Sequence, residues 1–250
     1  MISLAVSGGR GRMGSQILRL AFQDHTFRVV GALERSGHPD LGKDIGALLG
    51  LGTKEIVVSS ETEKILEKTD ILVEFSSPRA TLNHLRVVEK LKKAMVIGTT
   101  GLSPDETKAI EEASKTSPIL LSPNMSVGVN LLFSLVSEAA RRLGKEYEVE
   151  IIDTHHRHKK DAPSGTAKHL ADLVASARGD GSNIGVHSLR IGDVVGDHTV
   201  IFATLGERIE FTHRASSRET FALGALRAAQ FLSGKPPRLY TMQDVLKDKG

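Results

Sequence analysis

The stretch AVSGGRGRMGSQI, residues 5–17, joins a short apolar run to a segment with helical spacing of apolar residues. Gly8, Gly11 and Gly14 form the pattern GxxGxxG directly after the run. This is a variant of the GxGxxG turn, in which glycines let the backbone approach a pyrophosphate and the start of the next helix holds its charge. The stretch predicts a strand, turn and helix that either bind a dinucleotide or form an ordinary β-to-α connection.

The first half of the chain continues this alternation. Short apolar runs predict strands at residues 2–6, 27–34, 56–58, 71–75, 95–98 and 119–122. Between them, Ser60 with Glu63 and Ser103 with Glu106 have the spacing of helix capping boxes, and Pro104 suits a first helical position. Apolar strands separated by helices are typical of a parallel sheet covered on both faces. We therefore expect a doubly wound α/β domain.

The pattern changes near Ser126. A helix is predicted over 127–143, an alternating strand over 147–153, and a second helix beginning with Pro163. Strands are then predicted at 186–192, 198–205 and 208–215, the last two joined by a two-residue turn at Gly206-Glu207. Ser216 and Glu219 have capping-box spacing before a further helix. This second unit is expected to be α+β, with an open mixed or antiparallel sheet that another subunit could cover.

Residues at the carboxyl ends of the predicted parallel strands are candidates for cofactor contacts, because ligands bind at that edge of open α/β sheets. Glu34 lies about 20 residues beyond Gly14, the spacing at which an acidic residue accepts hydrogen bonds from an adenosine ribose. Arg35 could stack on adenine, pair with a 2′-phosphate, or lie in solvent, so NADH and NADPH both remain possible. The loops at 74–78, 98–101 and 122–128 should border the same crevice.

The stretch THHRHKKDAPSGTA, residues 154–167, gathers three histidines, one arginine and two lysines in six positions. If the preceding segment is extended, alternation sends His155 and His156 to opposite sides. A helix beginning at Pro163 would present the N–H groups of Ser164, Gly165 and Thr166 to an anion. Such a cluster suits a carboxylate substrate with a histidine as general acid. A metal site, a solvated run of charge and a nucleic-acid contact are alternatives, although the chain has no HExxH and no cysteine.

The composition narrows the class of protein. The 250 residues include no cysteine, carry a formal charge of +3 and are only 4% aromatic. No apolar run approaches the roughly 18 residues that a membrane span needs. Because the chain has few aromatic residues, stacking on the bases of a single-stranded nucleic acid is disfavoured. We expect a cytoplasmic protein with no membrane, nucleic-acid or metal partner.

Several motifs closely resemble those of the dihydrodipicolinate (4-hydroxy-tetrahydrodipicolinate) reductase family, in the same order and across essentially the whole chain. They are GGRGRMG, ALER, EFSSPRATLNHL, VIGTTG, NMSVGVN, THHRHKKDAPSGTA and SSRETFALGALRAAQFLSGK. The resemblance implies a Rossmann-like dinucleotide-binding domain over 1–126, to which the tail 219–250 returns. It also implies a substrate-binding and tetramerisation domain over 127–218.

The resemblance further implies a reaction and its residues. NADPH, NADH or both would reduce a small cyclic dicarboxylate in lysine and diaminopimelate biosynthesis, with His155 and Lys159 catalytic and the enzyme a homotetramer. His156, Lys159, Gly165 and Thr166 would bind the substrate. The residues expected at the cofactor are Gly8, Gly11, Arg12, Met13, Gly14, Glu34, Arg35, Gly98, Thr99, Thr100, Ser122, Pro123, Asn124 and Met125.

The cofactor preference and the class of function stay open at this point, because the sequence departs from the family pattern at two positions. Arg10 stands at a turn position that is often small, and Ser77 stands where some members have an arginine, which leaves the cofactor preference open. A related reductase of an amino acid semialdehyde, a dinucleotide-sensing regulator that binds nucleic acid, and a metal-dependent hydrolase are the alternatives.

Overall fold

The computed structural model describes residues 1–179, 181 and 183–248. The chain forms two compact units, one of Met1–Ser126 with the described residues from Glu219 onward, the other of Val127–Arg218. We call them unit 1 and unit 2. Residues 180, 182 and 249–250 of the expected domains lie outside the described part.

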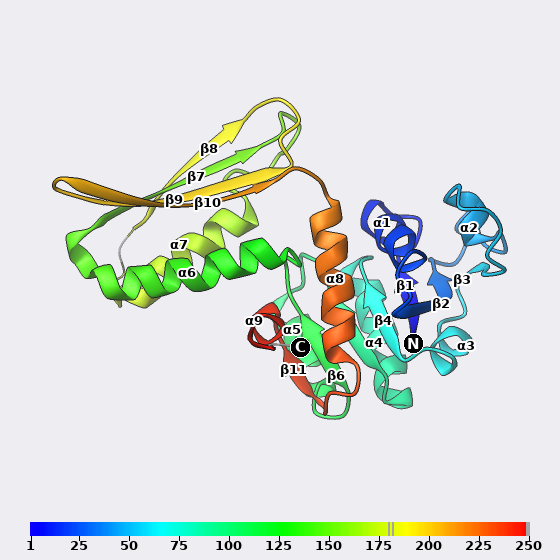
Figure 1. The fold of residues 1–250 in the computed structure, drawn as a ribbon. Coiled ribbons are helices and arrows are strands. Elements are labelled where there is room, and N and C mark those ends of the chain that lie inside the picture. Colours follow the sequence, from blue (N-terminus) through cyan, green and yellow to red (C-terminus); the bar gives the residue numbers. More distant parts are fainter. Residues whose placement is uncertain (180, 182, 249–250) are drawn as a thin grey trace. The chain divides into compact units, whose positions relative to one another are not determined.

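Unit 1 is built on a parallel sheet of seven strands, which confirms the predicted doubly wound α/β fold (Figure 1). The strand order is β11-β6-β5-β4-β1-β2-β3. The strands are β1 (Ile2–Ser7), β2 (Phe27–Leu33), β3 (Val58–Ser59), β4 (Ile71–Glu74), β5 (Ala94–Ile97), β6 (Pro118–Leu121) and β11 (Arg238–Tyr240). Helices cover both faces, so the central strands are apolar on both sides.

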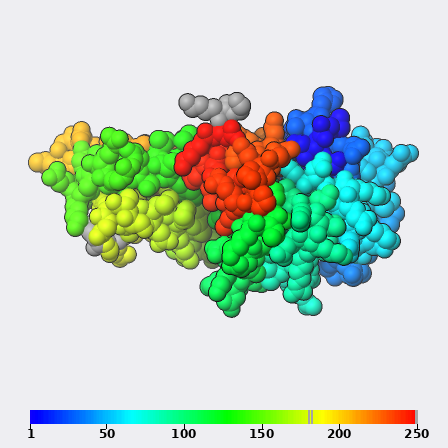
Figure 2. All heavy atoms as spheres, turned by 90° about the horizontal axis from the view of Figure 1, so that it is seen from below, coloured from blue at the N-terminus to red at the C-terminus, as the bar shows by residue number. Residues whose placement is uncertain are grey.

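One face of this sheet packs against α1 (Arg12–Ala21) and α8 (Glu219–Leu232), the other against α3 (Thr62–Glu67), α4 (Pro78–Leu91) and α5 (Pro104–Ala113). The short helices α2 (Ile45–Leu48) and α9 (Met242–Lys247) complete the unit. The C-terminal segment contributes structure here, because β11 pairs with β6 and α8 contacts α1, β5 and β6. Figure 2 shows this segment, in orange and red, against the green surface of the same unit.

Of the predicted capping boxes, one is confirmed and one is wrong. Ser103 and Glu106 do form a reciprocal box, with Pro104 as the first helical residue. Helix α3, however, begins at Thr62 with Glu61 at the N-cap, since the Ser59 hydroxyl accepts a hydrogen bond from the Glu61 N–H and prolongs the turn. Helix α8 spans Glu219–Leu232, the stretch predicted to be helical after Ser216.

Unit 2 has a mixed sheet of four strands, in the order β10-β9-β7-β8. The strands are β7 (Glu148–His155), β8 (Gly185–Arg190), β9 (Gly196–Thr204) and β10 (Glu207–Ala215). Helix α7 (Gly165–Arg178) connects β7 to β8 and makes that pair parallel, whereas β7–β9 and β9–β10 are antiparallel. Helix α6 (Val127–Leu143), with the predicted bounds, and the 3-10 turn Gly144–Glu146 precede β7. The hairpin loop is Leu205-Gly206, one residue earlier than predicted, since Thr204 already pairs with Glu207 and Gly206 has a φ of 89°.

The covered face of this sheet changes from apolar to polar along its length. Val149 lies opposite Phe202 and Ile151 opposite Val200, and these four buried side chains form one core cluster with residues of α6 and α7. Both helices lie on the same side of the sheet (Figure 1). The next pair in the same register is Asp153 opposite His198. Burying a carboxylate and an imidazole at the end of an apolar core is costly unless they are paired. The strand register therefore points to a functional site there.

No helix within the described residues is long and apolar enough to cross a membrane.

Candidate active site

The glycine turn of unit 1 leaves the start of α1 open to an anion. Gly11 is the N-cap, no side chain caps the helix, and none of its first-turn residues is acidic. Gly8 has a φ of 72°, and a Cβ on Gly14 would collide with the Gly8 carbonyl, so the turn requires glycine. Its backbone N–H groups and the positive end of the helix suit a pyrophosphate.

The predicted adenosine end carries a fixed carboxylate. Glu34 accepts a 2.8 Å hydrogen bond from the backbone N–H of Arg10. The Arg10 guanidinium in turn forms a 2.9 Å ion pair with Asp40. Hydrogen bonds from Lys43 and then Arg10 lower the pKa of Asp40. Arg35 is exposed. This edge therefore presents both carboxylate and guanidinium groups beside the glycine turn.

A pocket of about 450 Å³ opens at the carboxyl ends of the parallel strands. It brings together the sequence-predicted residues Arg12, Met13, Gly98, Thr99, Thr100, Pro123, Asn124 and Met125. The predicted residues Gly8, Gly11, Gly14, Glu34, Arg35 and Ser122 are not part of its lining. Ser122 is buried instead, with its hydroxyl donating to the Asn124 carbonyl.

Three lining residues were not named as site residues from the sequence. Phe75 and Ser76 belong to a loop that was expected at the crevice. Phe221 comes from α8, nearly a hundred residues beyond the other contributors, and an aromatic residue in an apolar helix is indistinguishable from core by pattern.

A buried carboxylate and a half-buried histidine support the turn at the pocket wall. Glu74 is fully buried, and its Oε2 lies 2.6 Å from Nδ1 of His84. The other oxygen accepts hydrogen bonds from the Ser76 N–H, at 3.0 Å, and from the Ser76 hydroxyl. A Cβ on Gly98 would collide with the Phe75 ring. The Phe75–Ser76 turn is thus held in place at the pocket wall.

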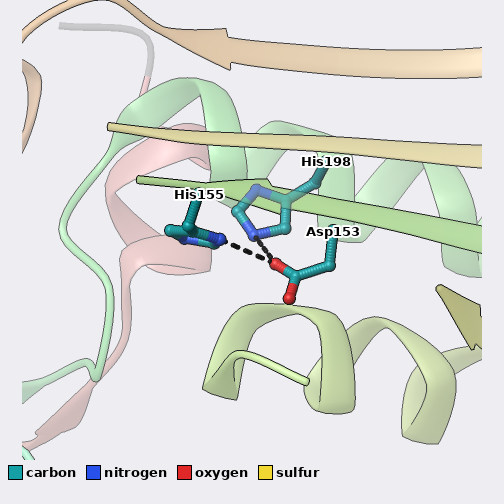
Figure 3. Close-up of side chains that lie close together, drawn as sticks. All are labelled: Asp153, His155 and His198. Carbon is teal, nitrogen blue, oxygen red and sulfur yellow. Dashed lines mark ion pairs between the residues drawn. The ribbon is translucent and has the colours of Figure 1, made fainter. Parts of the chain in front are cut away.

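In unit 2, three polar side chains meet at the buried end of the sheet (Figure 3). Nδ1 of His155 lies 2.9 Å from Oδ1 of Asp153, and Nε2 of His198 lies 3.4 Å from the same oxygen. All three residues are at least nine-tenths buried. His155 is the last residue of β7, so the strand's alternation keeps it on the same face as Asp153.

The second oxygen of Asp153 is occupied by other groups. Oδ2 accepts hydrogen bonds from the Ser164 N–H at 3.0 Å, the Ser188 hydroxyl at 3.3 Å and the Arg190 guanidinium at 3.1 Å. Burial alone would raise the pKa of Asp153, but hydrogen bonds from His155, His198 and Ser164 hold it well below the usual range. Asp153 is therefore an ionised carboxylate inside the unit.

His156 and Lys159 lie on the loop that follows. His156 lines a hollow of about 680 Å³ together with Arg157, His158, Gly192, Asp193 and Arg218. Burial, and then the charge of Arg218, lowers the pKa of His156. Lys159 forms a 2.8 Å ion pair with Asp161. The two adjacent histidines thus have different surroundings, as the alternation argument predicted.

The predicted start of α7 is wrong by two residues. The helix begins at Gly165, and Ser164 is its N-cap because the serine hydroxyl accepts a 3.2 Å hydrogen bond from the Ala167 N–H. Pro163 lies outside the helix. The Ser164 N–H is taken by Asp153, so Gly165 and Thr166 are the predicted residues left in the first turn.

Asp153, His155 and His198 are residue types that bind metals, and one donor atom of each lies within 4.8 Å of the others. A cation at their centre would stand beside the Arg190 guanidinium on the same carboxylate. The like charge opposes it, so the arrangement is better described as a carboxylate shared by two imidazoles.

Comparison with known proteins gives one family for both units. The family model described as the N-terminus of dihydrodipicolinate reductase matches residues 2–125, and that for the C-terminus matches residues 128–246. A 4-hydroxy-tetrahydrodipicolinate reductase of Anaeromyxobacter dehalogenans is 46% identical over 268 residues, covering 100% of this chain and 99% of the relative. One of Nitrosomonas europaea is 46% identical over 263 residues and covers 98% of each chain.

Solved structures share the fold. A dipicolinate-bound dihydrodipicolinate reductase from Paenisporosarcina sp. TG-14 has a TM-score of 0.81 at 22% identity, covering 96% of this chain and 97% of that one. An amine dehydrogenase from Mycobacterium smegmatis has a TM-score of 0.65 at 14% identity, covering 96% and 95%. The resemblance seen in the sequence is confirmed by the matches along both units, and the chain belongs to the dihydrodipicolinate reductase family.

Proposed function

We propose that this protein reduces 4-hydroxy-tetrahydrodipicolinate, by way of its dehydrated imine, to tetrahydrodipicolinate, with NADH or NADPH as the reductant. The observation that carries the proposal is the histidine backed by an ionised carboxylate, His155 on Asp153, directly before a loop rich in cations. A dicarboxylate substrate needs such a loop, and protonation of the reduced ring needs such an acid. Full-length relatives of this name support the same reaction.

The residues of unit 1 fit a nicotinamide dinucleotide. The uncapped start of α1 and the Gly8 and Gly14 turn form a cradle that a Cβ would fill. Glu34 would accept hydrogen bonds from the adenosine ribose. At the other end of the dinucleotide, Gly98 to Thr100 with Phe221 would enclose the nicotinamide in the 450 Å³ pocket. When bound, the reduced nicotinamide supplies the hydride. Residues of the pocket exclude water and fix orientation.

The residues of unit 2 would hold and protonate the substrate. His156, Lys159, Gly165 and Thr166 bind the two carboxylates through a cationic side chain, an imidazole and the N-terminus of α7. The reduced ring takes up one proton, for which His155 is the proposed donor and Lys159 the alternative donor. The carboxylate of Asp153 lies 2.9 Å from Nδ1 of His155 and faces the imidazole ring during the transfer.

The choice of cofactor rests on the adenosine edge. Glu34 favours the free ribose of NADH, while Arg35 and Arg10 provide positive charge for the 2′-phosphate of NADPH. Because Arg10 is already paired with Asp40, we propose that both cofactors are used and that neither is excluded.

A homotetramer is proposed through the uncovered face of the four-stranded sheet. Ile152, Leu189 and Ile201 project from neighbouring strands on the side away from Val149 and Ile151, and none of the three is buried. An apolar cluster on an open sheet face suits a subunit contact. Sedimentation velocity at micromolar concentration would give a single tetrameric species, whereas a monomer would contradict this part of the proposal.

The reaction is tested by mixing purified protein with freshly generated substrate and following the absorbance of NADH and NADPH in parallel. We expect oxidation of cofactor that depends on substrate and that falls by at least about 100-fold in His155→Ala and in Lys159→Ala. No oxidation with either cofactor by folded wild-type protein would overturn the proposal. Loss of activity on adding a chelator would favour a metal-dependent reaction instead.

A further inference from the structure

Asp153 divides its two oxygens between two sets of partners. Oδ2 accepts from a backbone N–H, a hydroxyl and a guanidinium, whereas Oδ1 faces two imidazoles (Figure 3). Among the described residues, neither Oδ1 nor Nδ1 of His155 has a hydrogen-bond partner of good geometry, each other included. The two atoms are nevertheless 2.9 Å apart, so an N–H on Nδ1 lies against the charge of the carboxylate.

We propose that Asp153 is a positioning residue, which with His198 holds the proton of neutral His155 on Nδ1 and leaves Nε2 as the atom that transfers a proton to the substrate. This inference rests on the proposed function, because it assigns the reacting atom of the proposed acid. Neither the family match nor the relatives' names assign Asp153 or His198 a role.

The fixed charges around Oδ1 support this assignment. Arg190 from β8 and the Ser164 N–H from α7 stabilise the carboxylate, so Asp153 stays an acceptor and requires an N–H from His155. His198 from β9 shares its Nε2 between Oδ1 and the Ser164 hydroxyl, 3.3 Å away. His213 from β10 has a lowered pKa through burial and then the charge of His198, and so favours its neutral form beside the cluster.

The other ring nitrogen has room for a reacting partner because of a glycine. A Cβ placed on Gly196 would lie 3.0 Å from Nε2 of His155 and 3.4 Å from its Cδ2. A larger residue would crowd the nitrogen that the proposal leaves for the substrate. The rings of His155 and His198 meet edge to face, with centroids 5.3 Å apart, which fixes the plane of His155.

The proton inventory of the step balances. Imidazolium His155 carries protons on both nitrogens; the N–H bond at Nε2 breaks, the proton bonds to the reduced, electron-rich ring of the substrate, and the N–H electron pair remains on Nε2. Neutral His155 then keeps its proton on Nδ1, facing Asp153. The reverse tautomer would place a lone pair on Nδ1 against the carboxylate, which is repulsive.

The tautomer can be measured without turnover. With histidines selectively labelled with ¹⁵N and His155 assigned from a His155→Gln sample, we expect the wild-type ring at alkaline pH to carry its proton on Nδ1. In Asp153→Asn we expect the proton to move wholly or partly to Nε2. A wild-type ring protonated on Nε2 would overturn the inference, whether or not the protein reduces the proposed substrate.

Kinetics provide a second readout, with Ser188→Ala as the matched control, since Ser188 touches the other oxygen of Asp153. For Asp153→Asn we expect kcat to fall about 10- to 100-fold with KM changed less than about threefold. Ser188→Ala should stay within about threefold in both constants.

Asp153→Glu keeps the charge and should recover part of kcat. An Asp153→Asn variant that is folded by its thermal melt and keeps wild-type kcat would contradict the positioning role. An inactive wild type would instead defeat the proposed function, while the tautomer measurement still decides this inference. If Asp153→Asn does not fold, the wild-type tautomer alone decides.

Discussion

Nζ of Lys159 lies 2.8 Å from Oδ1 of Asp161, two residues further along the same loop. The lysine side chain is 21% exposed and the aspartate side chain 55% exposed. The hydrogen bond from Lys159 is the largest cause of the lowered pKa of Asp161. The ammonium group proposed to hold the substrate is therefore already paired with a carboxylate that a dicarboxylate substrate can replace.

Lys159→Ala should lower kcat/KM by about 100-fold, because it removes both a cationic contact and a proton donor. Lys160→Ala is the matched control, since Lys160 is the next residue, carries the same charge and is exposed. We expect the control to change kcat/KM by less than about threefold. Equal losses in both variants, measured by steady-state kinetics, would mean that the general charge of the loop matters and the position of Lys159 does not.

The Arg10–Asp40 ion pair should influence cofactor choice. In Asp40→Asn the Arg10 guanidinium loses its partner beside Glu34, and positive charge there favours a 2′-phosphate. We expect the ratio of kcat/KM for NADPH to that for NADH to rise about three- to tenfold. Glu61→Gln removes a carboxylate from an exposed pair with Lys64 and should leave the ratio unchanged. An unchanged ratio in Asp40→Asn would exclude Arg10 from cofactor selection.

Gly224 is a buried glycine in the middle of α8 whose Cβ would collide with the Met125 carbonyl. Replacing glycine by alanine in a helix interior normally raises the free energy of unfolding by about 0.5–1 kcal/mol. Here Gly224→Ala should instead lower the melting temperature and weaken cofactor binding, because Met125 lines the pocket. The exposed Arg227→Ala, on the same helix, is the control. A melting temperature raised by Gly224→Ala would contradict the contact.

Much of the fold and of the candidate site could be predicted from the sequence, because the patterns that indicate them are local. Glycine spacing and apolar periodicity predicted the fold, and the resemblance of several motifs to the family supplied most of the pocket-lining residues. Phe221 could not be found, since only the return of α8 to unit 1 brings it to the pocket. The Asp153–His198 contact depends on the register of β7 against β9, which no pattern within either strand reveals. The helix starts near Ser60 and Pro163 were misplaced because neighbouring turns compete with local capping preferences.

Asp44 should make the stability of unit 1 dependent on pH. Its carboxylate caps α2 by accepting from the Ala47 N–H, and further bonds come from Lys54 and Ile56. The bond from Ala47 is the largest cause of its lowered pKa. This stabilisation is present above the unfolded-state pKa of about 3.9 and is lost as pH falls through the lower folded-state value.

The melting temperature of Asp44→Asn, compared with wild type, measures this effect. We expect the wild type to melt higher near neutral pH and the difference to begin to shrink as pH falls below about 4. The difference approaches zero below the lowered folded-state pKa, where both proteins carry a neutral cap. A difference that does not depend on pH would show that the charge of Asp44 is not involved.

The central claim is that the protein transfers hydride from the nicotinamide to the substrate. The most direct test follows a deuterium label from the cofactor into the product. Wild-type protein is given NADH or NADPH deuterated on one face of C4, in parallel with the opposite face, and the tetrahydrodipicolinate formed is analysed by mass spectrometry. The account predicts one deuterium in the product from one face and none from the other, because the pocket fixes the orientation of the ring. Cofactor oxidation without deuterium in the product from either face would contradict it.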